Sequence, residues 1–192
     1  MVPIAKQELR AAQTQGEALS PAVIEFLVLT AARENEVCGM QWREIDWQER
    51  VWTLPLERDK VGHKRKPENP HRVPLCNRAI MLLTMRRWPN GQGMEPDPDS
   101  YVWPSRDGAS HISGKATYKF LTQTMDMPIT VHGFRATFRT WAGNETNFDR
   151  VTCELALAHK SGDATELAYN RGDALNKRRA LMDAWSAYCN GQ

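Results

Sequence analysis

Apolar residues recur along the chain with two spacings, and the change between them separates predicted helices from predicted strands. Residues 22–32 form a nearly continuous apolar helix, with Ser20 as its N-cap and Pro21 at its first helical position. Further helices are predicted at residues 34–40, 77–87, 113–125, 132–143, 150–158 and 174–188. The chain is therefore expected to be mostly helical.

Two short stretches interrupt this helical pattern in the N-terminal third. Residues 51–54 and 72–75 are predicted to pair as strands, either as a long hairpin or within a three-stranded sheet. Residues 42–47 turn the chain, the Pro- and Gly-containing residues 89–100 form a loop, and residues 101–103 form a brief extended piece. The predicted fold class is α+β, mostly helical, with one small antiparallel sheet.

Length and composition suit a single domain. The chain has 192 residues, of which 41% are hydrophobic, enough for a sizeable core. No apolar run approaches the roughly 20 residues that span a bilayer, and the first ten residues lack the layout of a signal peptide. The cysteines Cys38, Cys76, Cys153 and Cys189 are scattered, without a CxxC pair. We therefore expect reduced thiols in a cytoplasmic protein with no membrane contact, and neither a zinc site nor a disulfide framework.

Charge is informative only locally. The formal net charge is +2, but residues 57–72 hold six basic and three acidic side chains, a local excess of three. A solvated loop explains such a cluster as well as a contact with DNA does. The charge pattern therefore leaves the partner open.

Two arginines are candidates for binding a phosphate. His132 and Arg135 are three residues apart at a predicted helix start, where they share a face and unpaired N–H groups favour an anion. Arg33 lies between two predicted helices, with Glu36 three residues on to hold its guanidinium. A guanidinium binds two phosphate oxygens at once and keeps its charge. Taken singly, these residues are equally explained as a surface histidine, a solvated arginine and a structural salt bridge.

A tyrosine and several lysines could supply the reacting groups. Tyr169 follows His159 by ten residues, beyond a glycine, on or next to a separate helix. A tyrosine becomes a useful nucleophile where cations stabilise its phenolate, although a tyrosine in the core is the ordinary alternative. Lys60, Lys64 and Lys66 lie on the predicted hairpin, where an ammonium could protonate a leaving alkoxide. Most lysines in such loops simply face water.

These candidates follow one another in an order that resembles the catalytic domain of the tyrosine recombinases. The resemblance covers roughly residues 20–189 and is closest to the integrases of temperate phages and genomic islands. Its sharpest stretches are TAARENEVCGMQWREID (30–46), HGFRATFRTWA (132–142) and LAHKSGDATELAYNR (157–171). On this basis residues 1–19 are a linker or tail, and residues 20–192 are the catalytic domain.

The resemblance implies site-specific recombination of double-stranded DNA, with integration or excision of a phage or genomic island as the outcome. Tyr169 would attack the scissile phosphate and form a 3′-phosphotyrosyl bond. Arg33 and Arg135 would bind the non-bridging oxygens. The partners implied are DNA and further recombinase protomers on it, with no small-molecule substrate.

The remaining roles concern protons. By the same resemblance, His132 would act as general base and later as acid, and Lys60 would protonate the 5′-oxygen that leaves. His159 would hydrogen-bond the phosphate or the arginine pair. No metal and no other cofactor is implied.

Members of the family carry a DNA-clamping helical domain ahead of this one, whereas about 20 residues precede the match here. The chain is therefore expected to be a fragment or a truncated relative that supplies half of the clamp at most. Three alternatives are a type IB topoisomerase, a DNA-binding module that has lost catalysis, and a helical protein without a nucleic-acid role. The integrase-like stretches favour a recombinase over a type IB topoisomerase. Usable residues at all six positions argue against a DNA-binding module that has lost catalysis. The order of these residues argues against a helical protein without a nucleic-acid role.

Overall fold

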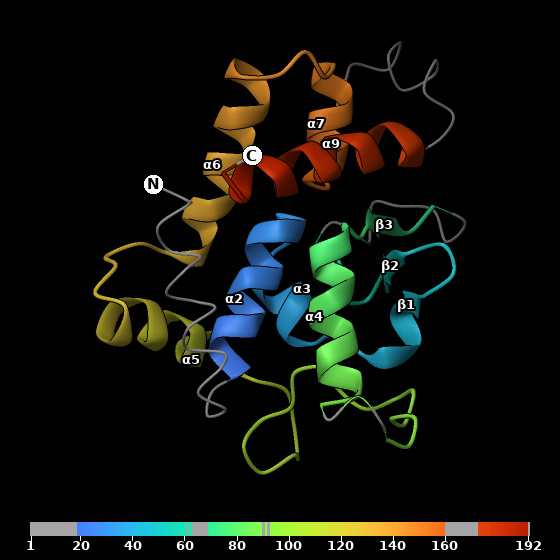
Figure 1. The fold of residues 1–192 in the computed structure, drawn as a ribbon, viewed down its shortest axis with the longest axis vertical. Helices are drawn as coiled ribbons and strands as arrows, with labels where there is room; N and C mark the ends of the chain where they lie inside the picture. Colours follow the sequence, from blue (N-terminus) through green and yellow to red (C-terminus); the bar gives the residue numbers. More distant parts are fainter. Residues whose placement is uncertain are drawn as a thin grey trace.

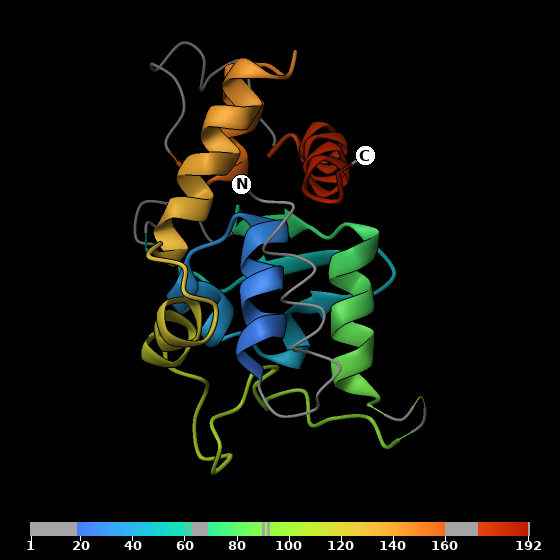
Figure 2. The ribbon, with the colours of Figure 1, turned by 60° about the vertical axis from the view of Figure 1, so that its left-hand side comes forward.

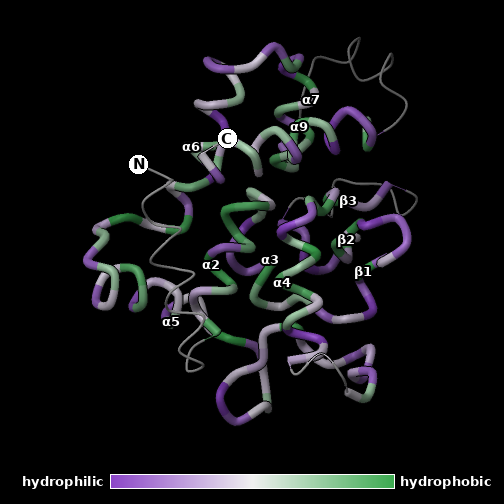
Figure 3. Tube along the Cα trace, viewed as in Figure 1, coloured by the Kyte–Doolittle hydropathy of each residue, from purple (hydrophilic) through white to green (hydrophobic). Residues whose placement is uncertain are grey.

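The apolar helix predicted after Ser20 is α2 (Leu19–Thr30), and it lies near the centre of the molecule (Figure 1). The computed structural model describes residues 19–60, 62, 69–89, 91, 93–159 and 173–191. Figure 3 shows α2 largely in the hydrophobic colour, and nearly all of its side chains are buried. The helix begins one residue before Ser20, so Ser20 lies inside it and is not its N-cap.

The end of α2 is set by a contact far away in the sequence. The helix stops at Thr30, two residues earlier than predicted, because Ala31 has a left-handed backbone with φ of 48°. Alanine favours a helix, but the carbonyl of Ala31 accepts a hydrogen bond from the side chain of Arg135. Next comes α3 (Glu34–Cys38), which is shorter than the predicted 34–40.

Of the two arrangements expected after α3, a long hairpin and a three-stranded sheet, the structure has the three-stranded sheet. A 3₁₀ turn, η1 (Trp42–Glu44), leads into the antiparallel strands β1 (Ile45–Asp46), β2 (Val51–Leu54) and β3 (His71–Pro74), in the order β1-β2-β3. The strand β2 has the predicted bounds, and β3 begins one residue before its predicted start. The pair Trp52 and Val73 marks the register of β2 and β3.

The predicted helices in the rest of the chain are present with small shifts. Their bounds are α4 (Asn77–Arg87), α5 (Gly114–Lys119), α6 (Val131–Asn144), α7 (Arg150–Ala156) and α9 (Leu175–Cys189). The predicted helix 113–125 continues from α5 as a π-helical turn, η3 (Phe120–Thr124). The extended piece near residue 101 pairs with Gln41 through an isolated bridge. The predicted fold class, mostly helical with one small antiparallel sheet, is confirmed.

The helices form two groups. In Figure 1, α6, α7 and α9 lie at one end of the molecule, whereas α2, α4 and the sheet lie at the other. The indole of Trp185 on α9 joins the groups, because its Nε1 donates to the carbonyl of Val28 on α2 at 2.7 Å. Around it, Phe138 and Trp141 of α6 and Tyr188 pack ring against ring. The aromatic contacts thus fix α6 relative to α2.

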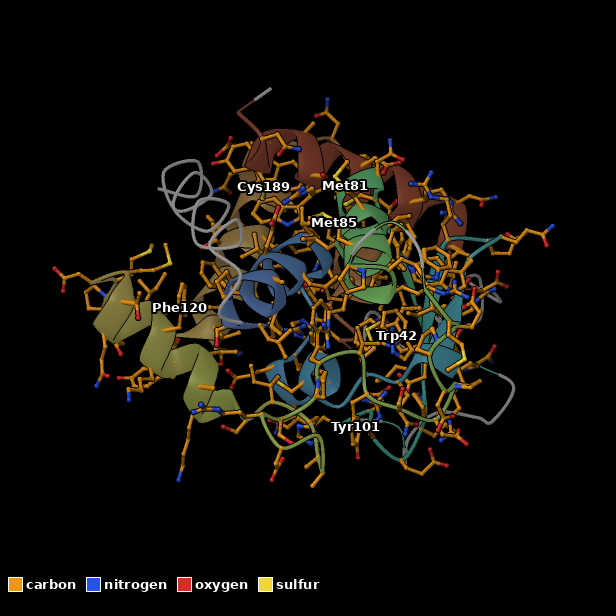
Figure 4. All side chains as sticks on the ribbon, turned by 60° about the horizontal axis from the view of Figure 1, so that its bottom comes forward. Trp42, Met81, Met85, Tyr101, Phe120 and Cys189 are labelled. Carbon is orange, nitrogen blue, oxygen red and sulfur yellow. The ribbon has the colours of Figure 1, made fainter. Side chains whose placement is uncertain are left out.

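No helix within the described ranges is long and apolar enough to cross a membrane. Met81 and Met85 are exposed and lie along α4, as Figure 4 shows. The four cysteines are buried and form no disulfide with one another.

Candidate active site

Arg33 is held by the first turn of the helix that it precedes. It has an extended backbone as the N-cap of α3, and its main-chain N–H donates to Glu36 Oε2 at 3.0 Å. Its Nη1 donates to Glu36 Oε1 at 2.8 Å, so one buried carboxylate fixes both the backbone and the guanidinium. The buried carboxylate of Asp59 lies 4.0 Å from the same Nη1. The sequence predicted the partner Glu36 and gave no sign of Asp59.

Arg135 is buried in α6 and is held mainly by backbone carbonyls. Its guanidinium donates to the carbonyl of Ala31 and, at 2.7 Å, to that of Leu157. Burial and the charge of Arg33 together lower the pKa of Arg135 to about 10, and the charge of Glu36 partly opposes the change. Two cations that destabilise each other in this way favour an anion between them.

His132 stands at the start of α6, as predicted. The helix begins at Val131, and the hydroxyl of its N-cap Thr130 accepts from the N–H of Gly133 at 3.3 Å. His132 is exposed in the first turn, while Arg135, one turn on, is buried. The spacing of three residues therefore places both on the side of α6 that faces the site.

Lys60 lies beyond the end of β2, in a segment anchored by Arg58. Lys60 is exposed. The Arg58 guanidinium donates to the carbonyl of Glu36 at 2.9 Å and forms an ion pair with the buried Glu44. Burial raises the pKa of Glu44, although hydrogen bonds from Trp52 and Arg58 partly offset this effect. Arg58 thus ties the segment that carries Lys60 to the helix behind Arg33.

Four of the six predicted residues line one cavity of about 830 Å³. Figure 2 shows that α3, α5 and the first turn of α6, which supply most of its wall, lie on the same side of α2. The predicted residues at the cavity are Arg33, Lys60, His132 and Arg135. Within the described ranges no cluster of His, Cys, Asp or Glu side chains has the arrangement of a metal site.

His159 lies just outside the cavity lining, against Arg135. Its Nε2 is 3.5 Å from Arg135 Nη2, and its Nδ1 is 2.7 Å from Glu154 Oε2. Tyr169, and the alternative lysines Lys64 and Lys66, lie outside the described residues. The structure therefore brings five of the six predicted residues to one region.

One wall of the cavity consists of residues that the sequence did not predict. Lys115 and Tyr118 line it from α5, which packs against α3 through Glu34. The Glu34 carboxylate accepts from the hydroxyl of Thr117, and a Cβ at Gly114 would lie 2.6 Å from Glu34 Oε2. A side chain at position 114 would therefore displace the Glu34 carboxylate from its present position. No local pattern signals this, because the contact joins segments 80 residues apart in the chain.

A family model described as the phage integrase family matches residues 5–175, and the chain belongs to that family. Prophage integrase IntA of Escherichia coli K12 is 30% identical over 83% of this chain. The integrase of Enterobacteria phage P4 is 24% identical over 93% of this chain. The matches cover 36% and 42% of those two proteins, so the chain spans less than half the length of these relatives.

Solved structures show the same fold. The integrase of mycobacterium phage Brujita superposes with a TM-score of 0.56 at 19% identity, over 85% of this chain and 50% of that one. The Tn1549 transposon integrase, in complex with circular intermediate DNA, gives a TM-score of 0.55 at 18% identity, over 88% of this chain and 59% of that one.

Proposed function

We propose that this chain is the catalytic domain of a site-specific tyrosine recombinase that cleaves and rejoins double-stranded DNA. The observation that carries the proposal is the convergence of Arg33, Arg135, His132 and Lys60 on one cavity, in a chain of the phage integrase family. Two guanidinium groups that face the same space suit the two non-bridging oxygens of a phosphodiester. The integrase of Tn1549, whose structure contains DNA, supports the choice of substrate.

The proposed reaction is a pair of phosphoryl transfers. The phenolic oxygen of Tyr169 bonds to phosphorus, and the bond from phosphorus to the 5′-oxygen breaks. The phenolic proton passes to His132, and Lys60 gives a proton to the departing 5′-oxygen. The products are a 3′-phosphotyrosyl linkage and a free 5′-hydroxyl. Rejoining reverses these steps with the 5′-hydroxyl of a partner strand, held by another protomer on the DNA.

Charge is the main contribution of the fixed arginines. Negative charge accumulates on the non-bridging oxygens as Tyr169 attacks, and preorganised cations stabilise it without reorganising. Burial makes this stabilisation stronger, because the guanidinium of Arg135 is little screened by water. His159, next to Arg135, adds a further hydrogen-bond donor to the phosphate.

The experiment is covalent trapping on a nicked duplex that carries the element's own attachment site. After denaturation, wild-type protein should remain attached to DNA, whereas Tyr169→Phe should bind the duplex and give no adduct. The matched control is Tyr118→Phe, because Tyr118 lines the cavity and also has a phenolic hydroxyl. Persistence of the adduct in Tyr169→Phe, or its loss in Tyr118→Phe alone, would show that the nucleophile is misassigned.

A further inference from the structure

Behind His159 lies a chain of polar contacts that the proposed reaction does not use. Glu154 of α7 accepts from Arg139 Nε through Oε1 at 2.6 Å, and its Oε2 lies 2.7 Å from His159 Nδ1. The Glu154 side chain is 13% exposed, whereas those of Arg139 and His159 are 39% and 45% exposed. The Glu154 carboxylate is thus the least exposed member of a bridge between Arg139 of α6 and His159, three residues beyond the end of α7.

The backbone reinforces this bridge. Ala158, two residues after the end of α7, adopts a left-handed conformation with φ of 53°. The main-chain N–H of His159 then donates to the carbonyl of Glu154 at 3.0 Å. Because backbone and ring are both tied to the same residue, the imidazole has one orientation relative to Arg135.

The chemistry of the carboxylate decides which ring nitrogen holds the proton. Burial opposes ionisation of Glu154, but hydrogen bonds from His159 and Arg139 outweigh it and hold the pKa of Glu154 below its usual value. An ionised carboxylate only accepts hydrogen bonds, so Nδ1 of His159 must be the donor. In the neutral ring, Nε2 then carries the lone pair and faces a donor, Arg135 Nη2, at 3.5 Å.

We propose that Glu154 is a positioning residue that holds His159 with its proton on Nδ1 and turns Nε2 toward Arg135. A second proton on the ring then occupies Nε2, the atom next to Arg135, and this is the proton that His159 donates to the phosphate. Arg139 keeps the second carboxylate oxygen occupied, so the carboxylate cannot rotate away. Only the identity of the acceptor, a phosphate, rests on the proposed function. The orientation and tautomer of the His159 ring do not depend on that function.

The replacement Glu154→Gln tests the inference, because a carboxamide has one acceptor and one donor. The guanidinium of Arg139 is only a donor, so it takes the carboxamide oxygen and leaves the NH₂ group facing His159 Nδ1. That nitrogen must then accept, and the neutral ring should move its proton to Nε2. The predicted result is an inverted tautomer, which a merely structural salt bridge between Glu154 and Arg139 would not produce.

The measurement is the ¹⁵N spectrum of the histidine rings, recorded without DNA and followed to the pH at which the His159 ring is neutral. The His159 signals are assigned by their loss in His159→Asn. Wild type should show a protonated Nδ1, Glu154→Gln a protonated Nε2, and the exposed control Glu145→Gln the wild-type pattern. A protonated Nε2 in neutral wild type, or an unchanged tautomer in Glu154→Gln, would overturn the proposal. The wild-type spectrum alone remains decisive where the variant does not fold.

A cleavage assay then connects the tautomer to the reaction. Loss of a residue that orients a functional histidine typically lowers activity about 10- to 100-fold, and we expect this loss in adduct formation at unchanged DNA affinity. The same replacement should have no effect in a His159→Ala background, because Glu154 acts through His159. An equal loss in both backgrounds would contradict a positioning role. Failure of wild type to form adduct would instead contradict the proposed function and leave the tautomer result standing.

Discussion

Arg33 and Arg135 are stabilised in the fold by different partners. Arg33 has the carboxylate of Glu36, whereas the hydrogen bonds of Arg135 within the described ranges go to carbonyls and to His159. Burial and the charge of Arg33 lower the pKa of Arg135 to about 10, so it is still protonated at neutral pH. A bound phosphate supplies the negative charge that its surroundings lack. Arg135 is thus the residue whose environment a phosphate would change most.

Replacement of either arginine by lysine should distinguish the contribution of its positive charge from that of the two-pronged geometry of its guanidinium. Lysine keeps the positive charge but cannot present two parallel N–H groups to a phosphate. We expect Arg33→Lys and Arg135→Lys each to slow adduct formation by about 10² to 10³, as measured in single-turnover cleavage. The control Arg106→Lys, on an exposed loop, should cleave at the wild-type rate. Near-normal cleavage by either site variant would mean that its fork does not bind the scissile phosphate.

At the scale of single residues, the sequence predicted five residues that the structure brings to one region and the partner Glu36, but it did not predict Arg58, Asp59 or Glu154. The spacing of His132 and Arg135 was sufficient to place both at one cavity, because three residues make nearly one helical turn. Glu154 and Arg58 act through contacts across the fold, and no local pattern reveals such contacts. Tyr169 stays a prediction, since it lies outside the described residues.

Among the elements, β3 and α9 are joined by the carboxylate of Asp173 and by a hydrogen bond from the Arg178 guanidinium to the carbonyl of Arg72. Asp173 precedes α9 and accepts from Arg72 of β3 at 2.8 and 2.9 Å. Its other oxygen contact is with Arg178, which is 1% exposed and lies on α9. Burial of Asp173 opposes its ionisation, but the hydrogen bonds from Arg72, with the charges of Arg178 and Arg72, hold the pKa of Asp173 below its ordinary value of 3.8.

Asp173→Asn should therefore destabilise the protein in a pH-dependent way. A carboxyl with a lowered pKa in the folded state adds stability that is fully present above 3.8 and is lost as the pH falls through the lower, folded value. We expect a loss on the order of 1 to 3 kcal/mol at pH 7, measured by urea unfolding, that shrinks below pH 4. The exposed control Asp183→Asn, also on α9, should show little change. An equal loss at pH 7 and pH 3 would contradict a role for the charge.

The bounds of helices and strands could be predicted where residues within the element determine them. The short stretch VWTL gave the bounds of β2, and the apolar run after Ser20 gave α2 to within two residues. The errors lie where distant contacts act. Ala31 leaves the helix because its carbonyl binds Arg135, and the π-helical turn η3 follows α5 without a local signal.

Within the described part of the molecule, few cations line the cavity that would face a DNA duplex. The net charge of the chain is only +2, and Arg58 and Arg72 of the basic stretch 57–72 are in ion pairs with acidic residues. Apart from Arg58, the lysines and arginines that line the cavity are Arg33, which is paired with Glu36, Lys60, Lys115 and Arg135. Affinity for DNA depends largely on how many phosphates are neutralised. A domain with this charge distribution should bind DNA weakly by itself.

The predicted weak affinity for DNA can be measured by titrating salt against binding to specific and scrambled duplexes. Each neutralised phosphate contributes about 0.9 to the fall of log K with log salt, so four cations predict a slope of magnitude below about 4. We expect little sequence preference, and Lys115→Ala should reduce the slope by about 1. Adding the N-terminal region of a longer homologous integrase should steepen the slope. Tight, site-selective binding by these 192 residues at physiological salt would contradict the expectation.

The hydrogen bonds of Arg135 also determine when the site exists during synthesis. They join it to Ala31, 104 residues earlier, and to Leu157, 22 residues later. A chain emerging from the ribosome meets the first partner long before the second, since synthesis proceeds from the N-terminus. The guanidinium of Arg135 therefore cannot take its final position until residue 157 has been made. A nascent or prematurely terminated chain that lacks residue 157 carries the two arginines without this arrangement, so the proposed cleavage of DNA would require a chain synthesised at least that far.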